Sequence, residues 1–205
     1  GFLRKEAFVS MNDSLQYYNQ HAKEFFDSTR DVKFKDMQER FLKYLQPGDR
    51  ILDFGCGSGR DTRYFMDRGF ETDAIDGSEE LVRIASEYTG IEVRQMYFQN
   101  LDEKEAYDGI WACSSILHLS YGELEDVFVK MARALNHHGI LYTSFKYGTA
   151  EGEPSGRYFT DMTERKMDKL LKDVNTFDIM EMWVTDDVRP GRAEEKWLNM
   201  ILRKK

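Results

Sequence analysis

The sequence ILDFGCGSGRD, residues 51–61, constrains the fold of this chain more than any other stretch. An apolar run that indicates a buried strand leads directly into Gly55, Gly57 and Gly59, and a helical pattern follows. Glycine at this density costs backbone entropy, so it is expected where the chain must turn tightly or lie close to a ligand. A strand, a glycine loop and a helix N-terminus in this order predict a nucleotide-binding loop.

The glycine spacing separates this loop from the dinucleotide-binding fingerprint. That fingerprint is G-x-G-x-x-G, whereas its last position is Arg60 here. Asp53 precedes the loop at the end of an apolar strand, where an unpaired carboxylate is costly. We expect it to have a cationic or hydrogen-donating partner, or to cap amides of the loop. Asp76 ends the next strand, where ribose hydroxyls bind in such folds; alternatively, Asp-Gly-Ser at 76–78 is only a turn and helix cap.

Strands and helices alternate after two N-terminal segments that have helical spacing. Strands are predicted at 50–54, 70–76, 91–97, 107–114 and 139–147, and two final strands, 177–187 and 195–204, are predicted to pair antiparallel. Ser78 is expected to cap one helix, and Ser120 with Glu123 to form a capping box for another. This order predicts an α/β fold with a mostly parallel sheet, covered on both faces. Ligands in such folds bind beyond the carboxyl ends of the strands.

Composition favours one domain and excludes several classes of site. We predict a single domain over 1–205, with cap helices in 1–46, a core in 47–205 and an insertion at 148–162. A net charge of −8 argues against a large nucleic-acid surface. Two cysteines and four scattered histidines predict neither a disulfide framework nor a metal site. No run resembles a signal peptide or membrane span, so we expect a cytoplasmic monomer or homodimer without a membrane partner.

Four stretches together resemble the class I S-adenosylmethionine-dependent methyltransferases. They are LDFGCGSGRDT (52–62), AIDGSEELVRIA (74–85), YDGIWACSSILHL (107–119) and ARALNHHGILYTSFKYG (132–148). Within that class the chain is similar to the small single-domain enzymes of the tellurite-resistance and quinone-biosynthesis types. The resemblance implies a Rossmann-like, doubly wound sheet of seven strands, mostly parallel with an antiparallel last strand. It also implies N-terminal helices over the cofactor site, and S-adenosyl-L-methionine as the cofactor.

The resemblance further implies roles for individual residues. Asp53 and the glycine loop would hold the methionine part of the cofactor, and Asp76 the ribose. The family's usual adenine-contacting Asp is absent after the third strand, so Phe98 or the side chain of Gln99 is expected to meet the adenine. Tyr17 or Tyr18 would bind the cofactor carboxylate or belong to the core. The full set of expected cofactor-binding residues is Asp53, Gly55, Cys56, Gly57, Gly59, Arg60, Asp76, Gly77, Ser78, Phe98, Gln99, Cys113, Ser114 and Tyr18.

The acceptor side of the site is predicted from cations near the carboxyl edge of the sheet. In an acidic chain such a cluster suits an anionic acceptor, for example a carboxylate, although solvated loop charge is the alternative. His118, after the fourth strand, is a candidate base, or else a surface or capping histidine. The insertion 148–162 is a candidate lid. The expected substrate-binding residues are Arg30, Lys146, Tyr147, Arg157, Phe159, Arg189 and Arg192.

These features predict methyl transfer to a small-molecule acceptor by in-line displacement, helped by proximity and a modest general base. No Asn/Asp-Pro-Pro-aromatic run follows the fourth strand and no proline precedes a cysteine, which disfavours nucleic-acid acceptors. Two alternatives stay open. One is a nicotinamide-dependent oxidoreductase, which the absent sixth-position glycine disfavours. The other is a non-catalytic module that binds S-adenosylmethionine.

Overall fold

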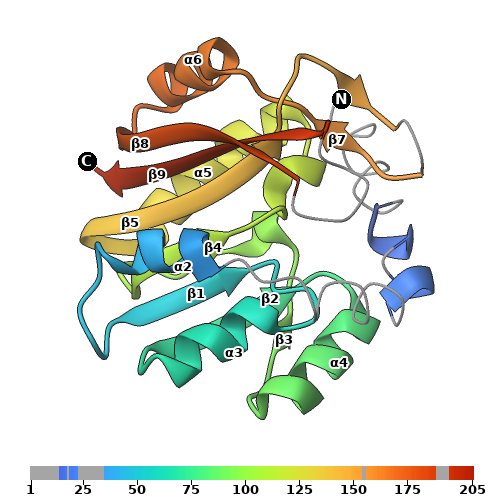
Figure 1. Ribbon diagram of the computed structural model, residues 1–205, viewed down its shortest axis with the longest axis vertical. Coiled ribbons are helices and arrows are strands. Elements are labelled where there is room, and N and C mark those ends of the chain that lie inside the picture. The colour runs from blue at the N-terminus through green and yellow to red at the C-terminus, as the bar shows by residue number, and fades with distance from the viewer. Residues whose placement is uncertain (1–13, 18, 23–34, 154–155, 188–193) are drawn as a thin grey trace.

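A seven-stranded sheet organises the chain in the computed structural model, which describes residues 14–17, 19–22, 35–153, 156–187 and 194–205 (Figure 1). The strands are β1 (Arg50–Phe54), β2 (Glu71–Asp76), β3 (Arg94–Gln95), β4 (Tyr107–Ala112), β5 (Leu135–Lys146), β8 (Phe177–Asp186) and β9 (Lys196–Lys204). Their order across the sheet is β3-β2-β1-β4-β5-β9-β8. The first five pair in parallel, and β9 runs antiparallel to both β5 and β8. The predicted mostly parallel sheet and terminal antiparallel pair are confirmed.

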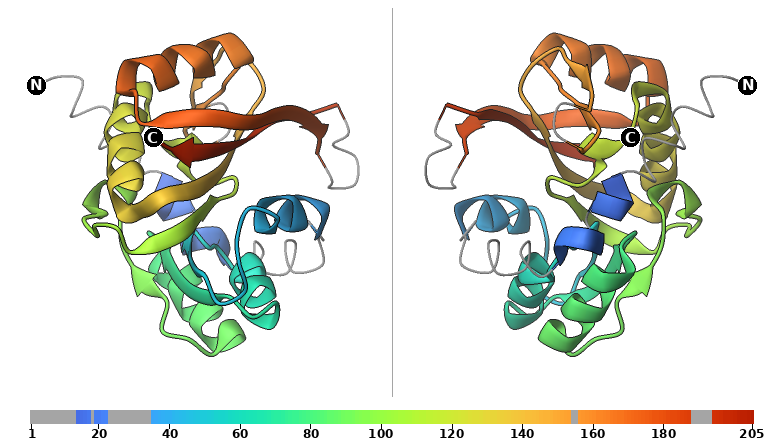
Figure 2. Two further views of the ribbon diagram at one scale, coloured as in Figure 1. Left: turned by 90° about the vertical axis from the view of Figure 1, so that its left-hand side faces the viewer. Right: turned by 90° about the vertical axis from the view of Figure 1, so that its right-hand side faces the viewer.

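Helices cover both faces of this sheet (Figure 2). On one face lie α2 (Lys35–Leu42), α3 (Arg60–Asp67) and α4 (Glu79–Thr89), and on the other lie α5 (Tyr121–Ala134) and α6 (Glu164–Val174). Two short 3-10 helices, η1 (Phe98–Asn100) and η2 (Ile116–His118), follow β3 and β4. The insertion contains a small hairpin of β6 (Glu151–Gly152) and β7 (Phe159–Thr160). Residues 14–17 and 19–22 are also helical.

The helices begin at the residues that the sequence marks. The Ser78 hydroxyl accepts a hydrogen bond from the backbone N–H of Leu81 and so caps α4. Ser120 and Glu123 form the predicted capping box of α5, in which each side chain accepts from the other residue's backbone N–H. These caps satisfy amide groups that the first turn of a helix leaves without partners. The helix starts are therefore fixed locally, close to the carboxyl edge of the sheet.

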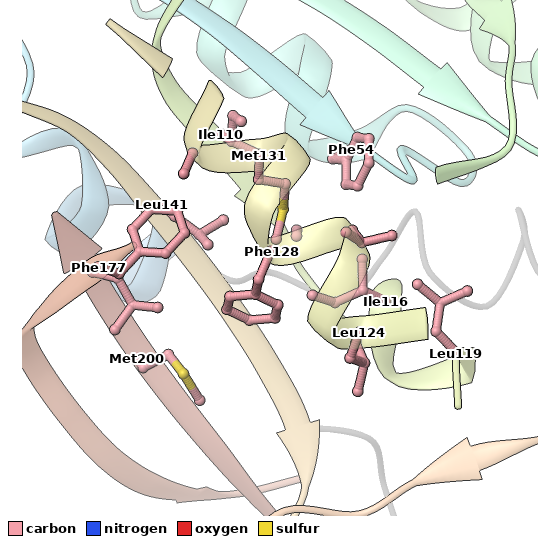
Figure 3. Packing of buried hydrophobic residues seen from close by; sticks show 14 of the residues in the cluster. Phe54, Ile110, Ile116, Leu119, Leu124, Phe128, Met131, Leu141, Phe177 and Met200 are labelled. Carbon is pink, nitrogen blue, oxygen red and sulfur yellow. The ribbon is translucent and has the colours of Figure 1, made fainter. Parts of the chain in front are cut away.

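The alternation of side chains along the strands divides the core in two. Figure 3 shows Phe128 and Leu124 of α5 among Leu141 of β5 and Met200 of β9, on the α5 face. On the α2 face, Trp111 of β4 stacks on Tyr142 of β5 with ring centroids 4.1 Å apart. Burying these side chains is the main stabilising term of the fold. The strands are thereby held rigidly under the loops that follow them.

Two predicted strands differ from the structure by more than two residues at one end. β3 is only Arg94–Gln95, shorter than the predicted 91–97, because it pairs with β2 alone at the sheet edge and the chain then turns into η1. β5 begins at Leu135 rather than at Gly139, with an irregularity in its pairing to β4 between Tyr107 and Gly109. Within the described part of the chain, no helix combines the length and the apolar character needed to cross a bilayer.

Candidate active site

A cavity of about 200 Å³ opens at the edge of the sheet where the parallel strands end. That is more than the roughly 150 Å³ in which an apolar cavity of another protein holds benzene, so an organic ligand can enter it. Its lining comes from the loops that follow β1 to β5, from the insertion, from β8 and β9, and from Ser14, Leu15, Met37 of α2 and Leu81 of α4. The predicted cofactor residues that line it are Gly55, Cys56, Gly57, Arg60, Asp76, Gly77, Phe98, Cys113 and Ser114.

The glycine loop needs Gly55 and Gly59 for different reasons. Both have positive φ values, +87° and +90°. A Cβ atom on Gly55 would lie 2.5 Å from Cβ of Ser115 and 3.0 Å from Cζ of Phe98, which line the cavity. A Cβ atom on Gly59 would instead lie 2.9 Å from Cγ2 of Thr89 at the end of α4. Gly55 therefore leaves room for Ser115 and Phe98 to pack directly on the loop at the cavity wall, whereas Gly59 allows α3 and α4 to pack closely.

Asp76 lies at the cavity and also holds the glycine loop in place. Its Oδ2 accepts a hydrogen bond from the backbone N–H of Gly57 at 2.9 Å, and its Oδ1 accepts one from the N–H of Ser78 at 2.9 Å. Burial raises the pKa of this carboxyl, and the two backbone donors oppose that shift. The Asp-Gly-Ser stretch is therefore a turn and helix cap, and at the same time it places a carboxyl group on the cavity wall.

Asp53 is buried beneath the loop and does not line the cavity. Its Oδ2 accepts a hydrogen bond from the Thr62 hydroxyl of α3 at 2.6 Å. Burial, followed by the nearby charge of Asp61, raises the pKa of Asp53 well above its ordinary value. Thr62 is thus a hydrogen-donating partner of the kind that we expected for this carboxyl.

Cys113 and Ser114 begin the loop after β4, and both line the cavity. Ser114 has a φ of +50°, and its N–H donates to the Ser144 hydroxyl at 2.9 Å. The hydroxyl of Ser115 donates to the carbonyl of Phe54 at 2.7 Å, which ties this loop to β1. Burial raises the pKa of the Cys113 thiol to about 12. The thiol is therefore protonated at neutral pH, which disfavours it as a nucleophile.

His118 is a buried cavity residue rather than a surface histidine. Its Nδ1 lies 2.7 Å from the carbonyl oxygen of Tyr158, and its ring packs on Phe159 with centroids 4.8 Å apart. Burial lowers the pKa of His118 to about 4, and the charges of Arg157 and Lys146 act in the same direction. The imidazole is therefore neutral at pH 7.

Two of the predicted substrate-binding cations, Lys146 and Arg157, line the same cavity as His118. The Nζ of Lys146 lies 3.9 Å from the centroid of the Phe159 ring, and Cζ of Arg157 lies 5.2 Å from it. Phe159 is itself buried and lines the cavity. The insertion thus brings Arg157 and Phe159 against the end of β5.

The remaining predicted residues lie elsewhere. Gln99 lies outside the cavity lining, and its side chain donates to Glu123 at 2.6 Å. Tyr147 is 39% exposed and donates to Glu164. Gly59 and Ser78, which open α3 and α4, lie outside the lining as well. Four predicted residues fall outside the described part of the chain, namely Tyr18, Arg30, Arg189 and Arg192.

Comparison with known proteins agrees with the resemblance seen in the sequence. Residues 51–139 match a family model described as a methyltransferase domain. A Staphylococcus carnosus protein named as an uncharacterized methyltransferase is 25% identical over 143 residues, which are 64% of this chain and 69% of that protein. The residues that match the family model, 51–139, contain the glycine loop, Asp76 and the loop after β4.

Solved methyltransferases share the fold. The Burkholderia thailandensis 1,6-didemethyltoxoflavin-N1-methyltransferase, with bound 1,6-didemethyltoxoflavin and S-adenosylhomocysteine, is 21% identical with a TM-score of 0.76, covering 98% of this chain and 90% of that one. A Methanosarcina mazei SAM-dependent methyltransferase is 19% identical with a TM-score of 0.69, covering 79% and 95%. Residues 51–139 of this chain therefore match a methyltransferase domain, and the chain shares the fold of solved S-adenosylmethionine-dependent methyltransferases. The match over the glycine loop disfavours the alternative of a nicotinamide-dependent oxidoreductase.

The sequence did not point to Asp61 as a residue of the candidate site. Asp61 is buried and lines the cavity. Its carboxylate accepts hydrogen bonds from Gln38 at 2.6 Å, from Trp111 at 2.9 Å and from both Nε and Nη2 of Arg60 at 3.1 Å. It stands within the first motif, but two of its partners come from α2 and β4. The spacing of residues within the motif does not indicate these two distant partners.

The part of the cavity wall that β8 and β9 build was also missed. It is built by Thr185 and Asp187 at the end of β8 and by Trp197 and Asn199 at the start of β9. Trp197 donates its indole N–H to Asp187 at 2.9 Å, and Asn199 donates to the hydroxyl of Thr185 at 2.9 Å. The rule that ligands bind beyond the carboxyl ends of strands does not point to β9. Because β9 is antiparallel, its amino end reaches that edge.

Proposed function

We propose that this protein is a class I S-adenosylmethionine-dependent methyltransferase, which transfers the methyl group to a small-molecule acceptor that carries an anionic group. The observation that carries the proposal is that Lys146 and Arg157 line the same cavity as the glycine loop and Asp76. A cation pair at a shared cavity suits a carboxylate or a similar anion, which arginine and lysine bind through charge-assisted hydrogen bonds.

The cavity wall that follows β1 to β4 fits the cofactor. Gly55 and Gly57 line the cavity and carry no side chain, which supports close approach of a ligand to bare backbone there. The loop from Gly55 to Arg60 would hold the methionine part, and Asp76 would accept hydrogen bonds from ribose hydroxyls. Phe98 and Met96 offer apolar surface for the adenine. When bound, the cofactor supplies an activated methyl group on a sulfonium, so the protein needs no strong electrophile of its own.

The acceptor would lie against β5 and β9, next to the cations. Lys146 pairs with Trp197, and Ser144 with Asn199, in the antiparallel register of these strands. Directly opposed residues of antiparallel strands share a face, with Cβ atoms about 5 Å apart. These four side chains therefore form one surface of the cavity. His118 and Phe159, which pack on each other, also line the cavity. The cavity gives the acceptor a cationic end and an aromatic wall.

His118 would act on the nucleophile of the acceptor. Its Nδ1 faces a carbonyl oxygen, which can only accept, so Nδ1 carries the proton and Nε2 carries the lone pair. A ring with a pKa of about 4 is a weak base. It suits a nucleophile whose proton becomes acidic only as the methyl group is transferred, and most of the acceleration would come from alignment and exclusion of water.

The proposal is tested by a screen of matched acceptor pairs. Each pair contains a small amine or phenol with a carboxylate and the corresponding primary amide, and S-adenosylhomocysteine formation is measured by mass spectrometry. We expect turnover with at least one carboxylate and at least tenfold lower kcat/KM with its amide. Equal turnover of both members of every accepted pair would overturn the anionic acceptor. S-adenosylhomocysteine formation with any acceptor also excludes the non-catalytic binding module.

A further inference from the structure

Asp61 joins three elements at the cofactor end of the cavity. Its carboxylate accepts from Arg60 beside it on α3, from Gln38 of α2 and from the indole of Trp111 on β4. The Asp61 and Gln38 residues are 7% and 2% exposed, so these hydrogen bonds are shielded from water. A buried carboxylate with several donors is held in one orientation, because leaving any donor without its acceptor is costly.

We infer that Asp61 is a positioning residue, which holds the guanidinium of Arg60 against the methionine end of the cofactor and makes that placement depend on α2 through Gln38. The inference rests on the proposed role of Arg60 in binding that end of the cofactor. It concerns Asp61 and Gln38, whose side chains need not touch the cofactor.

The geometry of the Arg60–Asp61 pair supports the inference. Nε and Nη2 of Arg60 both lie 3.1 Å from Asp61 oxygens, so one edge of the guanidinium plane is used in the pair. An arginine has five N–H donors, of which this pair uses two. The Arg60 side chain is 18% exposed and lines the cavity, as Asp61 does. A long side chain fixed in advance loses less rotational freedom when a ligand binds.

The contacts of α2 single out Gln38 as its link to this pair. Glu39 accepts from Arg68 at 3.0 Å and also from Tyr64, on the outer side of α3. Arg40 donates to Glu181 of β8 at 2.7 Å. These pairs attach α2 to the body of the protein and do not involve residues that line the cavity. Gln38, by contrast, donates directly to a cavity residue at 2.6 Å.

Asp61 could position Arg60 or act only through its negative charge, and these two roles predict opposite effects of its removal on cofactor affinity. The negative charge of Asp61 weakens the attraction of Arg60 for a second anion, so on charge alone its removal would tighten binding of the cofactor carboxylate. If Asp61 instead positions Arg60, its removal would loosen that binding. The direction of the change therefore decides between the two.

The experiment compares two ligands by calorimetry, without any acceptor. S-adenosylhomocysteine carries the amino-acid end, and 5′-methylthioadenosine has the same nucleoside and thioether without it. For Asp61→Asn we expect S-adenosylhomocysteine to bind at least about tenfold more weakly, the loss typical of a charge-assisted hydrogen bond. For the milder Gln38→Met we expect roughly a threefold loss, because one neutral donor is removed. The affinity for 5′-methylthioadenosine should stay within about twofold in both variants, which also shows that they are folded.

Glu39→Gln is the matched control, since it weakens an anchor of α2 that does not reach the cavity; it should leave both affinities unchanged. Equal losses for the two ligands would show a merely structural role and overturn the inference, as would Asp61→Asn binding of S-adenosylhomocysteine at or above the wild-type affinity. Unchanged S-adenosylhomocysteine binding by Arg60→Ala would remove the assignment on which the inference rests. None of these outcomes bears on the acceptor, so failure of the proposed anionic acceptor is recognised separately.

Discussion

The Nδ1 atom of His118 lies 2.7 Å from the carbonyl oxygen of Tyr158, and this contact joins the loop after β4 to the insertion that follows β5. Because a carbonyl oxygen only accepts, the contact fixes the tautomer of the ring and directs its lone pair to Nε2. It also places Phe159 against the ring, with centroids 4.8 Å apart. The candidate base and the acceptor wall are therefore one structural unit.

Replacing His118 by Asn should distinguish the roles of the two ring nitrogen atoms. The Asn amide can still donate to the carbonyl of Tyr158, as Nδ1 does, but it places no acceptor at the position of Nε2. If His118 is the base, kcat should fall roughly 100-fold, at the low end of general-base effects, with unchanged affinity for S-adenosylhomocysteine. His118→Gln, which reaches toward the Nε2 position, should retain more activity. A His118→Asn enzyme with wild-type kcat would show that the ring serves only packing.

The lowered pKa of His118 also predicts how stability depends on pH. Folded His118 has a pKa of about 4, below its ordinary value of 6.5, so between these values the unfolded chain binds the extra proton. The stabilising contribution of the neutral ring is complete above pH 6.5 and is lost as pH falls toward 4. Urea unfolding at pH 7 and pH 4.5 should show that wild type loses about 2–3 kcal/mol more than His118→Asn does. Parallel losses in the two proteins would contradict this.

Alanine at Gly55 and at Gly69 should separate backbone strain from crowding of the cavity. Both glycines have φ near +90°, so both substitutions carry a strain of about 1 kcal/mol. A methyl group on Gly55 meets Ser115 at 2.5 Å, whereas one on Gly69 has nothing within 4 Å. We expect both variants to lose thermal stability and only Gly55→Ala to lose binding of S-adenosylhomocysteine, by about tenfold or more. Equal affinities in calorimetry would mean that Gly55 does not border the cofactor.

Local sequence patterns were enough to predict the elements whose ends are set by neighbouring residues. The helix caps at Ser78 and Ser120, the glycine loop and the terminal antiparallel pair all depend on residues close together in the chain or on simple alternation. The length of β3 was overestimated, because its apolar run continues beyond the two residues that pair with β2.

The candidate site was predicted where it follows the parallel strands and in the insertion after β5, which supplies Arg157 and Phe159. Asp61 escaped notice because Gln38 and Trp111, which orient it, are 23 and 50 residues away in the sequence. Trp197 and Asn199 escaped notice because they begin an antiparallel strand, which brings its amino end to the site. Gln99 lies after β3 as expected, but hydrogen bonding with Glu123 directs its side chain to α5, and no local pattern indicates that choice.

We propose that Lys146 and Arg157 select an anionic acceptor, and this claim is tested by measuring the preference of the enzyme for a carboxylate over its matched amide. In the wild type we expect a kcat/KM ratio of at least about tenfold. In Arg157→Ala the ratio should fall toward one, mainly through a higher KM for the carboxylate, while affinity for S-adenosylhomocysteine is kept. Lys172→Ala, which removes an exposed cation of α6, should leave the ratio unchanged. A ratio that survives in Arg157→Ala and in Lys146→Ala would contradict the claim.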